Sequence, residues 1–504
     1  MKYVMGIDHG GTSMKAVLFD IRGREIASAH RSTPMLTPKP GYTERDMEDL
    51  WIKNCETVKE TIEKSGVNAA DIVGISFSGH GKGLYLWGKD GRPARAGIVS
   101  TDSRAYKIVE KWTEDGTAAR AYPLICQKTL ACQPVALIRW IMENEPGVIE
   151  NTQYIFGIKD YVRFRMTGVA KAEITDFSGS SLVNVNTASY DDEILKIYGL
   201  ECVRDKLPEL VYSSSFCGKV TAECAALTGL KEGTPVAAGL FDIDACAIGM
   251  NVVDDSRIAV IAGTWAINEY LSRKPVTNGT VQMNSRYALK EYFLCEECSP
   301  TSASNYDWFL NNFMQEAAKE SGKNIYELCN AMVDGVAPDR QSIMFLPYLF
   351  GGTDDPRTKS VLLGLEAWHG REDVLRAVCE GVVYGHRRQV ERLQNSRAEK
   401  AKAVRLAGGV VRASGWVQMF ADVLGLNVET IDVDELGALG AAMTAAVAAG
   451  EYADLRSAAA EMVRVDKVYT PNPEYKEIYD KKYEKYLKVE ADMQRLFADL
   501  EENA

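Results

Sequence analysis

Two glycine turns in this chain have residue types that bind phosphate groups. Gly10-Gly11-Thr12-Ser13 lies between Asp8 and Lys15, and Gly263-Thr264 follows the apolar segment 257–262. Because glycine has no Cβ, several backbone N–H groups can approach one phosphate there. A carboxylate such as Asp8 can hold Mg²⁺ or its waters beside the turn. One glycine turn usually only reverses the chain, but two of them after apolar segments predict a nucleotide site.

The familiar signatures of nucleotide binding do not account for such a site. The sequence contains no GxxxxGK[ST] loop, and no GxGxxG motif follows an apolar, strand-like segment. The first motif indicates a P-loop and the second a dinucleotide-binding fold. A nucleotide must therefore be held by another arrangement, for which the two turns are the candidates.

Hydrophobic alternation predicts the elements around the first turn. Residues 3–8 and 15–20 form the two strands of a hairpin with the glycines at its tip. Residues 46–65 have the spacing of an amphipathic helix, and residues 71–78 form a buried strand. That strand runs into the glycine-rich segment 79–83.

The same pattern returns near the middle of the chain. Residues 257–262 and 265–271 predict a second hairpin with Gly263-Thr264 at its tip. The remaining predicted elements are strands at 234–239 and 403–406 and helices at 414–424, 438–449 and 473–504. Strands and helices thus alternate, which indicates an α/β fold with two related halves.

Length and charge limit the possible classes of protein. A chain of 504 residues is too long for one hydrophobic core, so roughly two to four domains are expected. Its content of 46% hydrophobic and 25% charged residues is that of a globular protein rather than a disordered one. The net charge of −12 disfavours nucleic acids and anionic membranes as partners. A phosphorylated ligand would need a local cationic or backbone-amide site.

The termini and cysteines favour a cytoplasmic enzyme. The apolar run at the N-terminus is too short for a signal peptide, and no segment approaches the ~20 apolar residues of a membrane span. Eleven irregularly spaced cysteines fit reduced thiols better than a disulfide framework. The pair Cys295 and Cys298 lacks a second pair or a nearby histidine, so a structural role is favoured over zinc binding.

A set of motifs, ordered along residues 3–470, resembles the FGGY carbohydrate kinases. The motifs are Asp8-His9-Gly10-Gly11-Thr12, Gly41-Tyr42-Thr43-Glu44-Arg45-Asp46, Asp160-Tyr161 with Thr167-Gly168, Gly239-Leu240-Phe241-Asp242, Gly263-Thr264, Ser302-Ala303-Ser304 with Asp307-Trp308-Phe309, and Gly408-Gly409. The resemblance implies an α/β protein of two actin-like, ribonuclease-H-like ATPase domains with a nucleotide cleft between them. Residues 1–247 would bind the sugar and residues 248–504 the ATP. The implied reaction moves the γ-phosphoryl group of ATP to a hydroxyl of a small sugar or polyol, with Mg²⁺.

The resemblance also implies roles for individual residues. Asp242 corresponds to the general base that accepts the proton of the attacking hydroxyl, although an aspartate there can also be a helix N-cap or a turn residue. Asp8 and Asp242 correspond to metal-associated carboxylates. The residues implied for ATP and its phosphates are Gly10, Gly11, Thr12, Ser13, Lys15, Gly263, Thr264, Ala303, Gly408, Gly409 and Arg412.

The segment after the strand at 71–78 is expected to select the substrate. His80 lies between glycines, which suggests an accessible side chain that contacts the sugar, together with Gly81. Lys82 is either solvated or a cation in the sugar site that suits a carboxylated or strongly polar substrate. Asp102 and Arg104 either shape the sugar pocket or form an ordinary structural ion pair.

The resemblance is strongest to the ketopentose kinases of the family. A ketopentose such as L-xylulose is therefore the expected substrate, and a C4 polyol or ketose such as erythritol is the alternative. A member of the same fold can also be an ATP-driven switch or scaffold, which would not need a base at Asp242. The sequence leaves the oligomeric state open, with a homodimer as the candidate.

Overall fold

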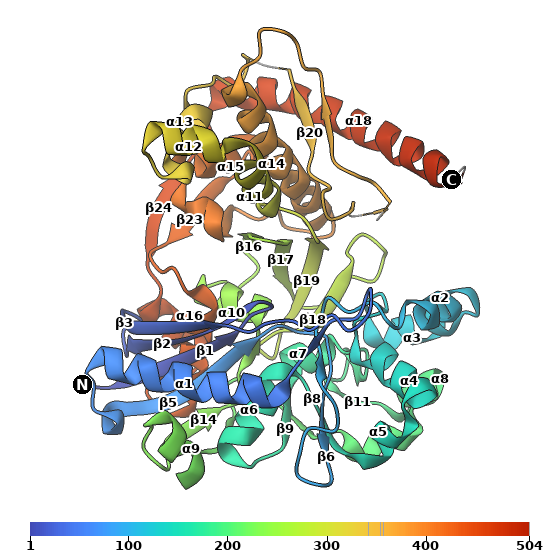
Figure 1. The fold of residues 1–504 in the computed structure, drawn as a ribbon, viewed down its shortest axis with the longest axis vertical. Coiled ribbons are helices and arrows are strands. Elements are labelled where there is room, and N and C mark those ends of the chain that lie inside the picture. The colour runs from blue at the N-terminus through green and yellow to red at the C-terminus, as the bar shows by residue number, and fades with distance from the viewer. Residues whose placement is uncertain (341, 353, 356, 503–504) are drawn as a thin grey trace. The chain divides into compact units, whose positions relative to one another are not determined.

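The chain forms two compact α/β units, and it passes between them several times (Figure 1). A computed structural model describes residues 1–340, 342–352, 354–355 and 357–502. The first unit comprises residues 1–253, 271–295 and 433–464. The second comprises residues 254–270, 296–432 and the chain from 465 onward. Each unit contains a twisted sheet with helices packed against it.

The sheet of the first unit has the strand order β13-β14-β5-β1-β2-β3, and β15 also pairs with β5. The strands are β1 (Tyr3–His9), β2 (Ser13–Asp20), β3 (Glu25–Ser32), β5 (Ile72–Gly79), β13 (Phe216–Lys219), β14 (Pro235–Ala237) and β15 (Leu240–Phe241). Strands β1 and β2 are antiparallel, with His9 opposite Met14, so Gly10, Gly11 and Thr12 form the turn. Strand β5 runs parallel to β1 and to β15. The predicted first hairpin is therefore confirmed.

Helices cover both faces of this sheet. Helix α1 (Met47–Ser65) packs against β2 and β3, whereas α16 (Leu436–Ala448) packs against β1 and β5. Successive side chains of a strand point to opposite faces. Accordingly Met5 and Ile7 join the core on the α1 side, while Gly6 between them faces α16. A Cβ at Gly6 would lie 1.8 Å from the carbonyl oxygen of Ala438, so glycine is what lets α16 lie this close.

The rest of the first unit surrounds a second core made mainly by helices. The helices of this second core are α2 (Tyr106–Glu114), α3 (Thr117–Ile125), α4 (Pro134–Asn144), α5 (Pro146–Asn151) and α8 (Asp192–Tyr198). Further helices of the unit are α6 (Ile158–Thr167), α7 (Ile174–Ser178), α9 (Ala222–Thr228), α10 (Asp242–Gly249) and α17 (Leu455–Met462). Short strand pairs lie among them: β4 (Glu44–Arg45) with β7 (Gly97–Ile98), β6 (Tyr85–Gly88) with β8 (Thr152–Phe156), β9 (Lys171–Glu173) with β12 (Glu209–Val211), and β10 (Val183–Asn184) with β11 (Ser189–Tyr190).

The sheet of the second unit repeats the arrangement of the first. Its strands are β17 (Ala266–Ser272), β16 (Arg257–Ala262), β22 (Ala403–Ala407), β23 (Asn427–Ile431) and β24 (Val465–Tyr469), in that order across the sheet. Strands β19 (Phe293–Ser299) and β18 (Met283–Arg286) continue this strand order beyond β17, although β18 lies within residues 271–295, which are counted with the first unit. Strands β16 and β17 form an antiparallel hairpin, and β22 runs parallel to β16 as β5 does to β1. The predicted relation between the two halves is thus confirmed.

The helices of the second unit include the one predicted at residues 414–424, which has the predicted bounds. They are α11 (Ser304–Phe309), α12 (Gln315–Ser321), α13 (Ile325–Asp334), α14 (Arg371–Asn395), α15 (Ser414–Leu424) and α18 (Lys476–Glu502), with a strand pair β20 (Met344–Leu346) and β21 (Val361–Leu363). The predicted C-terminal helix starts later than expected, because Pro473–Tyr475 form a separate 3-10 turn. Its expected last residues, 503–504, lie outside the described residues.

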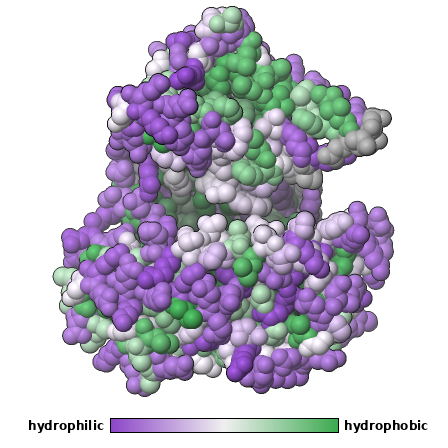
Figure 2. Space-filling model, viewed as in Figure 1, coloured by the Kyte–Doolittle hydropathy of each residue, from purple (hydrophilic) through white to green (hydrophobic). Residues whose placement is uncertain are grey.

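The visible surface is mostly hydrophilic, and hydrophobic residues gather over the second unit near β20 and α18 (Figure 2). Within the described part of the chain, no helix is long and apolar enough to cross a membrane.

The contact between β1 and α16 gives a direct test of the fold. Gly6→Ala should destabilise the protein by about 1–3 kcal/mol, because the added methyl group overlaps backbone that cannot move aside easily. Thermal and urea unfolding measure the effect. In the control variant Gly147→Ala the methyl group meets no atom within 4 Å, and the unfolding midpoint should not fall. Equal midpoints for Gly6→Ala and the wild type would contradict this packing.

Candidate active site

Three strand ends of the first unit bring the predicted catalytic residues together. Strands β1, β5 and β15 are parallel neighbours; Asp8 of β1 pairs with Ser78 of β5, and Leu240 of β15 pairs with the same Ser78. Asp242, which begins α10, and His80, which follows β5, therefore lie at the same sheet edge as Asp8. Ligands of open α/β sheets bind at the carboxyl ends of the strands.

Asp242 is a partly exposed carboxylate in an unfavourable electrostatic environment. Its Oδ1 accepts a hydrogen bond of 2.8 Å from the backbone N–H of Ile243. The pKa of Asp242 is raised to about 8, first by removal from bulk water and then by the negative charges of Asp8 and Asp176, while Lys82 opposes the shift. A carboxylate that binds a proton near neutral pH is suited to accept one during a reaction.

Asp8 provides unused oxygen at the same place. Removal from water also raises the pKa of Asp8. Its Oδ1 is buried and has no hydrogen-bond partner among the described residues. Mg²⁺ prefers oxygen ligands and usually keeps several waters, with one or two protein carboxylates and substrate phosphates. Asp8 and Asp242 fit that pattern, and no cluster of three or more His, Cys, Asp or Glu side chains able to hold a metal occurs among the described residues.

His80 is buried, with 4% of its surface exposed, so the expectation of an accessible side chain was wrong. The flanking glycines allow tight packing: a Cβ at Gly79 would be 2.8 Å from Ile158, and one at Gly81 would be 2.4 Å from the ring of Phe241. Desolvation and the charge of Arg45 lower the pKa of His80 to about 3, so the ring is neutral.

The hydrogen bonds of His80 fix its tautomer. Nδ1 lies 3.3 Å from the carbonyl oxygen of Gly81, which can only accept, so Nδ1 carries the hydrogen. Nε2 then accepts from the hydroxyl of Tyr85 at 3.0 Å. The next residue, Lys82, has a left-handed backbone with φ of 60°. Its charge acts on both Asp242 and Cys132.

Asp102 and Arg104 bind each other and the segment before α1. Arg104 Nη2 donates to Asp102 Oδ2 and to Glu44, each at 2.8 Å, and Nε donates to Asp102 Oδ1 at 2.9 Å. Asp102 also accepts from the backbone N–H of Thr43 at 2.7 Å. The guanidinium of Arg104 lies 4.3 Å above the ring of Tyr42. Both charged groups are therefore largely used within the protein.

The first glycine turn is supported from one side by a buried arginine. The guanidinium of Arg45, 1% exposed, donates to the carbonyl of Gly11 and, at 3.5 Å, to that of Gly10. The carbonyl of Thr12 accepts from Thr33 at 3.0 Å. A Cβ at Gly11 would meet no atom within 4 Å, so the turn borders open space.

The flanks of this turn also contain two of the predicted phosphate residues. Ser13 begins β2, and Lys15 on the same strand pairs with both carboxylate oxygens of Glu435 at 2.8 Å. The ammonium group of Lys15 is thus held at the start of α16.

The second unit brings its predicted nucleotide residues to one sheet edge in the same way. The carbonyl of Thr264 accepts from the hydroxyl of Ser304, which follows Ala303 at the start of α11. A Cβ at Gly408 would lie 2.3 Å from the carbonyl oxygen of Ala262, next to Gly263. Gly409 differs from Gly408, because a Cβ at Gly409 would meet no atom within 4 Å. The same is true of a Cβ at Gly263. Arg412 ends the short 3-10 turn that begins at Gly409.

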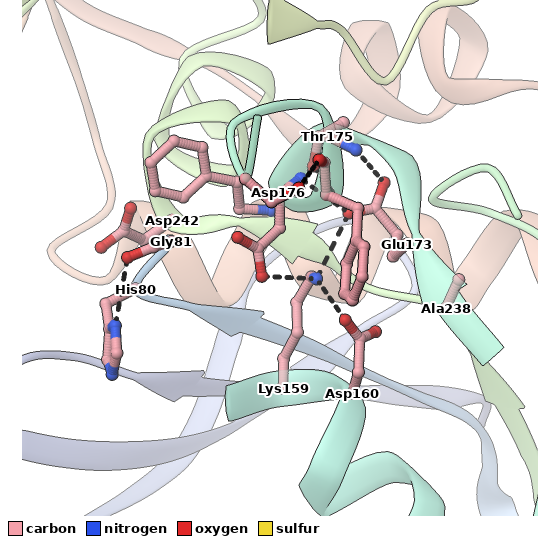
Figure 3. A network of polar contacts seen from close by, with 12 residues as sticks. His80, Gly81, Lys159, Asp160, Glu173, Thr175, Asp176, Ala238 and Asp242 are labelled. Atoms are coloured by element: carbon pink, nitrogen blue, oxygen red, sulfur yellow. Dashed lines mark hydrogen bonds and ion pairs between the residues drawn. The ribbon is translucent and has the colours of Figure 1, made fainter. Parts of the chain in front are cut away.

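Beside Asp242 lies a buried charge network that the sequence did not predict (Figure 3). The Lys159 ammonium group is fully buried and lies 3.2 Å from Asp160, 3.2 Å from Asp176 and 3.4 Å from Glu173. These residues come from α6, β9 and α7, so their meeting depends on tertiary packing that no local pattern specifies.

Comparison with known proteins identifies the family. Residues 3–249 match the N-terminal domain of the FGGY family of carbohydrate kinases, and residues 258–449 match the C-terminal domain. The chain belongs to the FGGY family. It is therefore a carbohydrate kinase, a phosphotransferase whose family implies the use of ATP and a small-molecule sugar substrate. The predicted enzyme class is confirmed, and the switch or scaffold alternative is set aside.

Relatives and solved structures agree with this assignment. The chain is 34% identical to the probable L-xylulose kinase of Haemophilus influenzae, over 97% of this chain and 98% of the relative. It is also 34% identical to the L-xylulose/3-keto-L-gulonate kinase of Escherichia coli, over 100% and 99% of the two chains.

The ligand-bound xylulose kinase of Lactobacillus acidophilus has the same fold, with a TM-score of 0.89 at 23% identity, over 99% and 100% of the two chains. The glycerol kinase of Plasmodium falciparum, solved with ADP, gives a TM-score of 0.85 at 18% identity, over 97% and 98%. The predicted two-domain, actin-like fold is confirmed.

The raised pKa of Asp242 predicts a pH-dependent cost to stability. An ordinary aspartate has a pKa near 3.9, so between about pH 4 and 8 the folded protein binds more protons here than the unfolded chain. The stability that this group contributes is full below pH ~4 and is lost as the pH rises toward ~8. Asp242→Asn removes this dependence, and in a metal-free buffer its melting temperature should exceed that of the wild type by about 2–5 °C at pH 9.

Differential scanning fluorimetry across this pH range measures the difference. It should shrink toward pH 5. A difference that does not change with pH would contradict the raised pKa.

Proposed function

We propose that this kinase phosphorylates a ketopentose, L-xylulose first among them, with Asp242 as general base. The observation that carries the proposal is the position of Asp242 beside Asp8 at the ends of adjacent parallel strands, with its pKa raised to about 8. The names of the relatives, which include L-xylulose kinases, support the substrate. Residues 1–247 would bind the sugar and residues 248–504 the ATP.

In the proposed reaction the sugar hydroxyl lies against the carboxylate of Asp242. As the hydroxyl oxygen attacks the γ-phosphorus in line, its proton passes to Asp242, the bond between the γ-phosphorus and the β-phosphate oxygen breaks, and ADP leaves. ATP supplies the phosphoryl group, and a divalent cation held by Asp8 and Asp242 would neutralise charge on the phosphates. Positioning by the surrounding residues supplies most of the rate enhancement in such transfers.

Each predicted nucleotide residue has a role in this proposal. The turn of Gly10, Gly11, Thr12 and Ser13, with Lys15, and the turn of Gly263 and Thr264 would bind the phosphates. The segments with Ala303, Gly408, Gly409 and Arg412 would border the adenosine. Open space at Gly11, Gly263 and Gly409 supports the proposal, because a ligand can come close to the backbone there.

His80, Gly81 and Lys82 would line the sugar site, while Asp102 and Arg104 would fix the segment that borders it. A screen of ATP consumption with pentuloses, tetritols, hexuloses and sugar acids tests the substrate. We expect the highest kcat/KM with a ketopentose. A preference for a tetritol such as erythritol would overturn the proposed substrate and leave the family assignment intact.

Removing the proton acceptor should disable the chemical step. Asp242→Asn should lower kcat by about 10²-fold or more, because the amide cannot accept the hydroxyl proton. Steady-state kinetics measure kcat, and calorimetry with a non-hydrolysable ATP analogue should give an affinity close to that of the wild type. Asp191→Asn is the matched control, since Asp191 caps α8 and accepts a hydrogen bond from the side-chain amide of Asn184, and asparagine caps a helix as well. Near-normal turnover of Asp242→Asn would rule out this base.

Substitutions at two adjacent glycines distinguish the loss of a nucleotide contact from a folding defect. Gly409→Val adds a side chain where the protein has open space, so folding should be retained while ATP affinity falls about tenfold or more. Gly408→Val instead collides with the backbone of Ala262 at a residue with φ of 99°, so it should destabilise the protein.

Calorimetry and thermal unfolding of both variants measure these effects. Sugar affinity should be unchanged in Gly409→Val. A Gly409→Val protein that binds ATP like the wild type would contradict the proposed adenosine contact.

A further inference from the structure

We propose that Asp176 is a second substrate-binding carboxylate, which accepts hydrogen bonds from hydroxyls of the acceptor sugar and disfavours sugars that carry a carboxylate. The inference rests on the proposed function and extends it, because it names the residue that selects neutral ketoses. The supporting observations are the position of Asp176, its unused oxygen and the charges around it.

A hydrogen-bonded link holds Asp176 beside Asp242. The backbone N–H of Phe241 donates to the hydroxyl oxygen of Thr175 at 2.9 Å, and that hydroxyl donates to Glu173 at 2.7 Å. Phe241 directly precedes Asp242 in the sequence, and Thr175 directly precedes Asp176. The start of α7 is therefore fixed against the start of α10, and the charge of Asp176 acts directly on Asp242.

Asp176 is the carboxylate of the Lys159 network that retains an unused oxygen. Asp160 is held by Lys159 and by Arg163, at 2.7 Å. Glu173 is held by Lys159 and by four further donors: the N–H groups of Thr175 at 3.0 Å and of Asp176 at 3.4 Å, the hydroxyl of Thr175 at 2.7 Å and the hydroxyl of Ser213 at 2.8 Å.

Asp176, in contrast, has a hydrogen-bond partner on one of its two carboxylate oxygens. Its Oδ2 accepts from Lys159 at 3.2 Å, whereas Oδ1 accepts no hydrogen bond from the described residues. Figure 3 shows that second oxygen on the side of Asp242 and Gly81. Asp176 is only 5% exposed, so a ligand that reached this oxygen would satisfy an acceptor that bulk water barely reaches.

Packing keeps the carboxylate in this position. A Cβ at Gly157 would lie 2.3 Å from Asp176 Oδ2, so the glycine leaves the space that the carboxylate occupies. The ammonium group of Lys159 donates to the same oxygen, from the side away from Asp242 in the view of Figure 3. The side chain is therefore oriented before any sugar binds, which reduces the cost of ordering it on binding.

The charges near Asp176 favour a neutral ligand. Within the network, Lys159 and Arg163 face the three carboxylates of Asp160, Glu173 and Asp176, which leaves one negative charge in excess. Asp242 adds a second negative charge when it is ionised. Sugar hydroxyls are donors that suit these acceptors, whereas a substrate carboxylate would be repelled.

Lys82 is the cation near Asp242 that opposes this effect. Its positive charge lowers the pKa of Asp242 and so already offsets part of the negative charge of that carboxylate. Lys82 is therefore a counter-charge to Asp242 and does not bind a substrate carboxylate. A site that hydrogen-bonds a hydroxyl discriminates strongly, because its buried acceptor is left unpaired by the wrong ligand.

The test compares Asp176→Asn with Asp160→Asn in the full-length kinase. Both variants remove one carboxylate from Lys159, but Asp160 is fully buried and bonded to Arg163 on its other oxygen. For Asp176→Asn we expect the KM for L-xylulose to rise about tenfold or more, with kcat within about threefold of the wild type. We expect kcat/KM for a sugar acid such as 3-keto-L-gulonate, relative to that for L-xylulose, to rise about tenfold.

Asp160→Asn should lower the melting temperature and leave both KM and the ranking of sugars unchanged. If Asp176→Asn does not fold, Asp176→Glu retains the charge, and its displaced oxygens should still change the ranking of ketopentose epimers. Unchanged KM and ranking in a folded Asp176 variant would overturn the inference. So would an equal rise of KM in Asp160→Asn.

Calorimetric titration of sugars without ATP separates this inference from the proposed function. A wild-type protein that turns over no ketopentose would refute the proposed function. If Asp176→Asn binds the wild type's sugar more weakly, the role of Asp176 is supported, whichever sugar the wild type binds. If the variant binds that sugar as tightly as the wild type does, the role of Asp176 is refuted.

Discussion

The structure depends on holding two carboxylates close together and away from bulk water at one sheet edge. Asp8 and Asp242 repel each other, and desolvation raises the pKa of both. Such an arrangement costs stability and persists only where the surrounding packing fixes it. Strand β5 provides this support, because it pairs with β1 on one side and β15 on the other and so sets the positions of both aspartates.

Helix α16 completes the support from behind the sheet. It packs against β1 and β5 through small residues, as the contact between Gly6 and Ala438 demonstrates. The helix is contributed by residues 433–464, a segment that returns to the first unit late in the chain. The electrostatic cost of the site is thus offset by backbone packing between segments more than four hundred residues apart in sequence.

The local elements could be predicted from the sequence because their signals are local. The two hairpins follow from alternating hydrophobicity and glycine turns, and α1 from its amphipathic spacing. The burial of His80 was not predictable, because flanking glycines can indicate either exposure or close packing. In this protein Ile158 and Phe241, both distant in sequence, decide between the two.

The Lys159 network escaped prediction for a related reason. A lysine followed by an aspartate reads as a solvated surface pair, and nothing nearby in sequence indicates that Asp176 and Glu173 fold against it. Residue roles drawn from the family resemblance covered Asp8, Asp242 and the glycine turns. They did not cover the carboxylate beside Asp242, whose position depends on the hydrogen bond between Phe241 and Thr175.

The central claim is that Asp242 must lose its proton before the sugar is phosphorylated. The pH dependence of kcat/KM for the ketopentose, at saturating ATP and Mg²⁺, tests this claim most directly. The account predicts that kcat/KM falls about tenfold per pH unit on the acid side, with a break well above the usual aspartate pKa of ~3.9 and at or below ~8, and that Asp242→Asn abolishes this limb. A profile that is flat down to about pH 5, or a limb that persists in Asp242→Asn, would contradict it.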